Sequence, residues 1–192
     1  MRSWLWAAGL MGIVGTTGAQ AAPLQIQVLD AKGQPLVGAV VALERSGQPE
    51  RARAGARAEM AQKDRQFAPQ ILVVQTGTEV HFPNLDPVRH HVYSYSSVKS
   101  FERKLYLGEG AEPVLFDRPG VVTVGCNIHD RMSAHIVVVD TPVFGLTDER
   151  GQLSLDAPAG GLTLQAWHPS RKDTKLHRQV LPPSATSYSL TL

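Results

Sequence analysis

Proline and glycine interrupt this chain so often that short strands, rather than long helices, are its expected elements. The 192 residues include 13 prolines and 17 glycines. Proline restricts helices and glycine supplies turn conformations. Between these breaks lie apolar runs with a period of two, as at Leu24, Ile26 and Val28, which is typical of strands. Many short strands separated by turns predict an all-β protein built as a sandwich or a barrel.

The apolar runs and turn residues place the expected strands along the whole chain after residue 23. Beyond the first run, they are expected at 37–43, 71–74, 79–82, 91–95, 121–124, 135–139, 162–166 and 188–192. One stretch, 49–63, could form a helix, but its polarity favours an exposed linker, and its arginines favour a solvated face.

The N-terminus has the pattern of a secretory signal peptide over residues 1–21. Arg2 precedes an apolar stretch at 4–14, and Ala19 and Ala21 give a small-x-small cleavage site. The stretch is about half of the ~20 residues that a spanning helix needs, although an uncleaved anchor is the alternative. We therefore expect a periplasmic protein with no stable membrane insertion after cleavage. The formal charge of +2 argues against a nucleic-acid partner.

The single cysteine lies in the most informative segment of the sequence. It forms the pattern C-x-x-H-x-x-M with His129 and Met132, between the expected strands 121–124 and 135–139. A thiolate, an imidazole and a thioether on one short loop suit copper. A blue-copper site needs a second histidine from elsewhere in the chain, and His90 and His91 are candidates. An idle thiol at Cys126 would also be exposed to oxidation in the periplasm.

These residues give the segment 57–140 a resemblance to the cupredoxins of the plastocyanin and amicyanin type. The run F-A-P-Q-I-L-V-V-Q-T-G-T-E-V-H-F-P-N-L-D at 67–86 resembles early strands of that family. His-His-Val at 90–92 resembles its His-Asn-Val, and the ligand loop has the short amicyanin spacing. The resemblance implies a Greek-key β-sandwich with one type 1 copper site, and an architecture similar to methylamine utilization proteins.

The same resemblance implies a ligand set of His90, Cys126, His129 and Met132, the last as the weak axial ligand. His91 departs from the asparagine of the family and is the alternative ligand; neighbouring side chains on a strand face opposite ways, so both histidines are not expected to bind one ion. Asn84 is a candidate for supporting the ligands, or for forming a turn. His129 would be the electron port.

The two ends of the chain resemble the opening and closing strands of a carboxypeptidase regulatory-like, or transthyretin-like, β-sandwich. The motifs are V-L-D-A-K-G-Q-P-L-V-G-A-V-V-A-L at 28–43 and T-D-E-R-G-Q-L-S-L-D-A-P-A-G-G-L-T-L-Q-A-W-H-P at 147–169. We therefore expect a discontinuous sandwich of residues 22–56 plus 141–192, with Trp167 in its core and the cupredoxin inserted; insertion in a loop costs little closure entropy. Two unrelated arms flanking the domain are the alternative.

The predicted function is that of a one-electron carrier between redox protein partners, and not that of an enzyme. Asp130 and Arg131 would make the rim of the copper loop polar. A copper-delivery protein would use the same ligands. A Cys-His hydrolase is disfavoured because no acid that would orient a histidine beside Cys126 can be identified in the sequence. A structural β-module without metal would not require these ligand types at this spacing.

Overall fold

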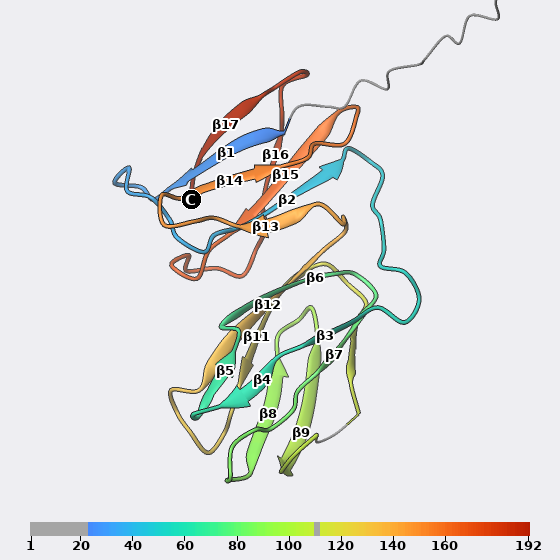
Figure 1. Ribbon diagram of the computed structural model, residues 1–192, viewed down its shortest axis with the longest axis vertical. Coiled ribbons are helices and arrows are strands. Elements are labelled where there is room, and N and C mark those ends of the chain that lie inside the picture. The colour runs from blue at the N-terminus through green and yellow to red at the C-terminus, as the bar shows by residue number, and fades with distance from the viewer. Residues whose placement is uncertain (1–22, 110–111) are drawn as a thin grey trace, which may run out of the picture.

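The computed structural model describes residues 23–109 and 112–192, and within these ranges every regular element is a strand (Figure 1). The all-β prediction is confirmed. The expected signal peptide, residues 1–21, lies outside the described residues. Neither described range contains a helix with the length and apolar character needed to span a bilayer.

Strands from both ends of the chain form one sandwich, which we call the terminal sandwich. Its two sheets have the orders β14-β1-β17 and β13-β2-β15-β16. Leu24, Ile26 and Val28 are buried on one face of β1, as their alternation predicts, and they pack against Val41 and Leu43 of β2. The strands are β1 (Leu24–Leu29), β2 (Val40–Arg45), β13 (Phe144–Leu146), β14 (Gln152–Leu155), β15 (Leu162–Trp167), β16 (His177–Val180) and β17 (Ser187–Thr191).

The strands between β2 and β13 form a second sandwich, the central sandwich. Its sheets have the orders β6-β12-β11-β8-β9 and β10-β7-β3, and β4 and β5 form a separate hairpin. The core between the sheets includes Val80, Val92, Val122 and Ile136. The strands are β3 (Arg57–Glu59), β4 (Ala61–Lys63), β5 (Gln66–Ala68), β6 (Ile71–Gln75), β7 (Thr78–His81), β8 (His90–Tyr95), β9 (Ser100–Tyr106), β10 (Val114–Phe116), β11 (Gly120–Gly125) and β12 (Ser133–Val139).

The structure contains several strands with polar sequences that the sequence analysis does not predict. The stretch 49–63, expected as a linker, contains β3 and β4, and the polar run Ser100–Tyr106 forms β9. Strand β3 pairs in parallel with β7, and β9 pairs antiparallel with β8. Because β3 and β9 lie at sheet edges, backbone hydrogen bonds hold them while their side chains stay largely in water. They therefore lack the apolar alternation that marks a half-buried strand.

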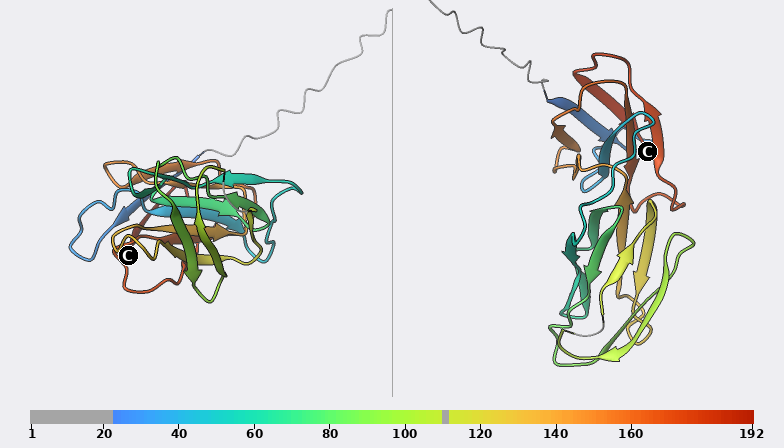
Figure 2. Two further views of the ribbon diagram at one scale, coloured as in Figure 1. Left: turned by 90° about the horizontal axis from the view of Figure 1, so that it is seen from below. Right: turned by 90° about the vertical axis from the view of Figure 1, so that its right-hand side faces the viewer.

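The two sandwiches lie one above the other along the longest axis and share a third apolar cluster (Figures 1 and 2). Val40 and Ala42 of β2 and Trp167 of β15 meet Val137 and Val139 of β12 there. Trp167 was expected inside the terminal sandwich; instead it packs in the cluster between the sandwiches, because the outer face of β2 and β15 packs against β11 and β12 of the central sandwich.

His135 of β12 closes one side of this cluster. Its ring meets Trp167 edge-on at a centroid distance of 4.8 Å, and its Nδ1 lies 3.2 Å from Thr123 Oγ1. Burial lowers the pKa of His135, since the charged imidazolium would lose water contacts there. His135 is therefore a packing residue of the contact between the sandwiches, and it is not one of the clustered donors described below.

A pair of valine truncations tests the contact between the sandwiches. Val137 is fully buried in the shared cluster, whereas Val180 is exposed on the edge strand β16. Val137→Ala should lower the free energy of unfolding by about 2 kcal/mol, through lost burial and an unfilled cavity. Val180→Ala should change it by less than about 0.5 kcal/mol. Urea unfolding followed by Trp167 fluorescence measures both, and equal effects would contradict the packing described.

Candidate metal centre

Two backbone hydrogen bonds close the loop that carries the cysteine motif. Strands β11 and β12 pair in register from Gly120 opposite Val138 to Gly125 opposite Ser133. Beyond that last pair, the N–H of Cys126 donates to the carbonyl of Met132 at 3.1 Å, and the N–H of Met132 donates to the carbonyl of His129 at 2.9 Å. The loop is therefore a tight extension of the hairpin, which limits where its side chains can point.

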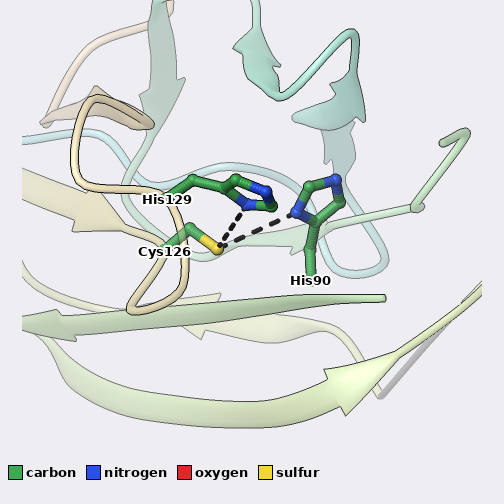
Figure 3. A group of neighbouring side chains, drawn as sticks. All are labelled: His90, Cys126 and His129. Carbon is green, nitrogen blue, oxygen red and sulfur yellow. Dashed lines mark hydrogen bonds between the residues drawn. The ribbon is translucent and has the colours of Figure 1, made fainter. Parts of the chain in front are cut away.

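Three potential metal ligands converge at this end of the central sandwich (Figure 3). Cys126 Sγ lies 3.8 Å from His90 Nδ1 and 3.7 Å from His129 Nδ1. His90 begins β8, whereas the other two residues lie on the β11–β12 loop. His90 and Cys126 are buried and His129 is partly exposed. Two imidazoles from separate elements thus face one sulfur.

These separations fit a single metal ion held by the three side chains. A first-row metal such as zinc binds imidazole nitrogen at about 2.0 Å and thiolate sulfur at about 2.3 Å. Two such ligands at 120° would stand about 3.7 Å apart, which matches both sulfur-to-nitrogen distances. The donor atoms of all three residues lie within 4.8 Å of one another, so little side-chain movement is needed to bind an ion.

His91 points away from this cluster, on the other face of β8. Its Nε2 lies 3.1 Å from Glu102 Oε1 of β9, without hydrogen-bond geometry, and its ring meets Tyr93 edge-on at 5.8 Å. The alternation of side chains along a strand explains why His90 and His91 cannot share one ion. The structure places His90, and not His91, beside Cys126.

Met132 and Asn84, the other predicted site residues, lie near the cluster in different ways. Met132 is buried in the same apolar cluster as Cys126. Asn84 Nδ2 donates to the carbonyls of Val88 and Tyr106, both at 2.8 Å, and its Oδ1 accepts from the N–H of Asp86 at 3.0 Å. Asn84 thus organises the backbone of the loop before β8 and supports the site indirectly.

Asp86 is the site residue that sequence reasoning missed. Its Oδ2 lies 2.7 Å from His90 Nε2, on the side of the ring opposite the sulfur. Burial would raise the pKa of this carboxyl, but hydrogen bonds from the Arg65 N–H, the His90 ring and the Asp64 N–H, and the positive charge that His90 has only when doubly protonated, lower it below its usual value. An ionised Asp86 favours a proton on Nε2 and leaves Nδ1 free for a ligand role.

The contact also corrects the expectation that no acid would orient a histidine next to Cys126. The only signal in the sequence was an aspartate four residues before His90, within D-P-V-R-H, and such a spacing in a loop does not predict contact. Cys126, His90 and Asp86 alone would resemble a nucleophile, base and acid. However, Cys126 is only 5% exposed and a second imidazole also faces its sulfur, so the set favours metal binding.

Amicyanins and a cupredoxin are among the solved structures that match about half of the chain. A reduced amicyanin mutant has 18% identity and a TM-score of 0.40, covering 51% of this chain and 97% of its own. Amicyanin from Paracoccus versutus has 16% identity and a TM-score of 0.39, and the match covers 50% of this chain and 96% of the amicyanin. A purple cupredoxin from Nitrosopumilus maritimus has 21% identity and a TM-score of 0.37, and the match covers 43% of this chain and 98% of the cupredoxin. The expected resemblance to cupredoxins agrees with these matches, whereas that of the flanking strands to regulatory-like sandwiches stays a prediction.

No protein-family model matches the chain, and no curated protein is similar enough in sequence to count as a match. At these identities and TM-scores, the likeness to solved structures carries no argument about function. The chemistry of the centre is therefore judged from the positions of its own side chains.

Alanine substitutions at the two adjacent histidines test which ring belongs to the site. His90→Ala should lower Cu(II) affinity by more than about 100-fold, since removing even an outer partner of a ligand costs 10- to 100-fold. His91→Ala should stay within a few-fold of the unchanged protein, although both side chains are buried. Competition titration against a chelator measures the affinities. The opposite ranking would assign the ligand role to His91.

Proposed function

We propose that the centre is a type 1 copper site and that the protein carries single electrons between redox protein partners. The convergence of two imidazole nitrogens on one thiolate sulfur, at 3.7 and 3.8 Å, is the observation that carries the proposal. A His2Cys set with a weak axial ligand is the characteristic donor set of such sites. Met132, buried in the same apolar cluster as Cys126, is the proposed axial ligand.

Copper bound here would alternate between Cu(II) and Cu(I), accepting and releasing one electron. The residues of the chain keep the donors in place during that change. The backbone bonds of the β11–β12 loop hold Cys126 and Met132, and Asp86 holds the His90 ring. Burial of Cys126 and His90 keeps water from the donors, so substrate chemistry at the metal is not expected and an enzymatic role is disfavoured.

His129 is the proposed electron port because it is the only one of the three donors that is partly exposed. Exposed apolar side chains lie on the segments next to the donors. Ile128 directly precedes His129 and is exposed, and Leu105 of β9 is exposed as well. Leu85, Val88 and Leu107 are exposed on the neighbouring segments. An apolar rim of this kind suits brief docking with a partner, while Asp130 and Arg131, also exposed, add the expected polar part.

Copper delivery without electron transfer is the second candidate, since the same donors would bind the ion that is passed on. Partly exposed His129 would then be the first donor to exchange. Electron self-exchange measured on the copper-loaded protein separates the two functions. A carrier should exchange electrons faster than it releases copper to a chelator, whereas a delivery protein should do the reverse.

The proposal also covers the division into domains and the location of the protein. Residues 57–140 would form the copper domain, and residues 22–56 plus 141–192 the sandwich around it; the pairing of β1 with β14 and β17, and of β2 with β13 and β15, supports this division. We also propose a periplasmic location after cleavage of residues 1–21, in line with a buried, metal-bound thiol. We further propose that the architecture of this chain is similar to that of methylamine utilization proteins.

The colour of the Cu(II) protein tests the type 1 assignment. Loading with Cu(II) should give an intense blue or purple absorption from thiolate-to-copper charge transfer, and Cys126→Ser should abolish it. The alanine variant of His91, which faces away from the centre, is the matched control and should keep the colour. A colourless Cu(II) adduct of the unchanged protein would rule out the assignment.

A charge placed on the apolar rim tests electron transfer through His129. Ile128→Lys should slow electron self-exchange by about tenfold, because two equal charges would meet when two copies dock. Val180→Lys, at an exposed site on the terminal sandwich, should leave the rate unchanged. Nuclear magnetic resonance line broadening in mixtures of the reduced and oxidised protein gives both rates. An unaltered rate for Ile128→Lys would place the port elsewhere.

A further inference from the structure

The turn between β4 and β5 has an unusual backbone. Asp64 and Arg65 both have positive φ angles, 54° and 58°. They are the two residues between Lys63 and Gln66, which pair as the last residues of the hairpin. Such a two-residue turn normally takes Asn-Gly or another glycine-containing pair. Strained backbone in residues other than glycine persists where the surrounding structure holds it, often at functional sites.

The strained turn donates two hydrogen bonds to the carboxylate that contacts His90. The N–H of Asp64 donates to Asp86 Oδ1 at 2.7 Å, and the N–H of Arg65 donates to Asp86 Oδ2 at 2.9 Å. Two consecutive left-handed residues turn their N–H groups to the same side, which forms a concave site for an anion. Oδ2 also lies 2.7 Å from His90 Nε2, so a continuous chain of contacts joins the turn to the ligand.

The hairpin itself is fixed to the segment that carries Asp86. The N–H of Gln62 donates to the carbonyl of Pro83 at 2.8 Å, and the N–H of Leu85 donates to the carbonyl of Gln62 at 2.8 Å. The buried Gln62 side chain also donates to the carbonyl of Phe82 at 3.0 Å. Asp86 is thereby held from both sides, and its side chain is only 8% exposed.

We propose that the β4–β5 turn is a positioning device for the metal ligand His90, with the N–H groups of Asp64 and Arg65 acting through the Asp86 carboxylate. The device would keep the proton of His90 on Nε2, hold the ring plane, and direct Nδ1 towards Cys126 Sγ. This inference rests on the proposed copper function for its effect on redox balance, but the positioning itself is a property of the metal-free chain.

The charge of Asp86 should favour Cu(II) over Cu(I). A carboxylate that accepts the hydrogen bond of a ligating imidazole increases the basicity of the nitrogen that binds the metal. The more highly charged ion gains more from that basicity. Loss of the turn contacts should therefore loosen His90 and shift the copper couple towards Cu(I).

Two substitutions at position 65 isolate the contribution of the turn. Arg65→Pro removes the N–H that donates to Asp86, and its ring cannot adopt a φ of 58°. Arg65→Gly also loses the guanidinium but keeps the N–H and accepts a positive φ, so it is the matched control. Circular dichroism and Trp167 fluorescence establish that each variant is folded.

The first measurement uses metal-free protein. In the unchanged chain and in Arg65→Gly, nitrogen-15 spectra should show the His90 ring with its proton on Nε2 and protected from exchange. In Arg65→Pro, the ring should sample both tautomers, and the proton should exchange faster. A folded Arg65→Pro protein with the tautomer and exchange of the unchanged chain would overturn the proposal.

The second measurement is the midpoint potential of the copper-loaded protein. Arg65→Pro should raise the ratio of Cu(I) to Cu(II) at a given applied potential about tenfold, equivalent to about 59 mV for one electron, while Arg65→Gly should not. If Arg65→Pro does not fold, Asp86→Asn, which keeps the turn residues, should give the same shift, and no shift would refute the device. If the unchanged protein gives no blue copper adduct, the proposed function fails, while the metal-free spectra still decide the positioning role.

Discussion

The antiparallel ladder between β11 and β12 is the interaction on which most of this structure depends. It runs without a break from Gly120 opposite Val138 to Gly125 opposite Ser133. At one end it closes the loop of Cys126, His129 and Met132. At the other, β12 leads into β13 of the terminal sandwich. The side chains of β12 alternate between two cores, with Ile136 and Val138 inside the central sandwich and Val137 and Val139 against the terminal one.

This alternation couples the position of the loop to the packing of both sandwiches. A shift of β12 by one residue would exchange its two buried faces. Because both faces are apolar and covered, the register is strongly specified, and the loop beyond it has one geometry. The donor residues on the loop are therefore placed by a rigid scaffold, as the proposed copper site would require.

His90 reaches the centre by an independent route. It comes from β8, and the sulfur on one side of its ring and a carboxylate on the other fix its orientation. Asp86 is in turn held by backbone N–H groups of the β4–β5 turn. A buried carboxylate without partners would be costly, so these N–H groups stabilise the charge and place it at once. Tyr106 adds to the same region: burial raises its pKa to about 12, so its hydroxyl keeps its proton and donates to the carbonyl of Phe82.

Much of the fold and most of the donor set could be predicted from local patterns. The alternation at Leu24, Ile26 and Val28 defines a half-buried strand without reference to the rest of the chain, because a strand places every second side chain on one face. The spacing of Cys126, His129 and Met132 is also local, and it predicts a shared site because a tight loop keeps neighbours together. Edge strands such as β3 and β9 escaped prediction because their backbone bonds, rather than buried side chains, hold them.

The sequence by itself determined that this chain is all-β, and that one loop carries a thiolate, an imidazole and a thioether at metal-ligand spacing. Only the tertiary structure decided that His90 faces the sulfur while His91 faces Glu102, that Asp86 and the strained turn stand behind His90, and that Trp167 packs between the sandwiches. The physical reason is range. Periodicity and loop spacing act between residues close in the chain, whereas these contacts depend on which faces of distant strands meet and on backbone groups that no side-chain pattern reveals.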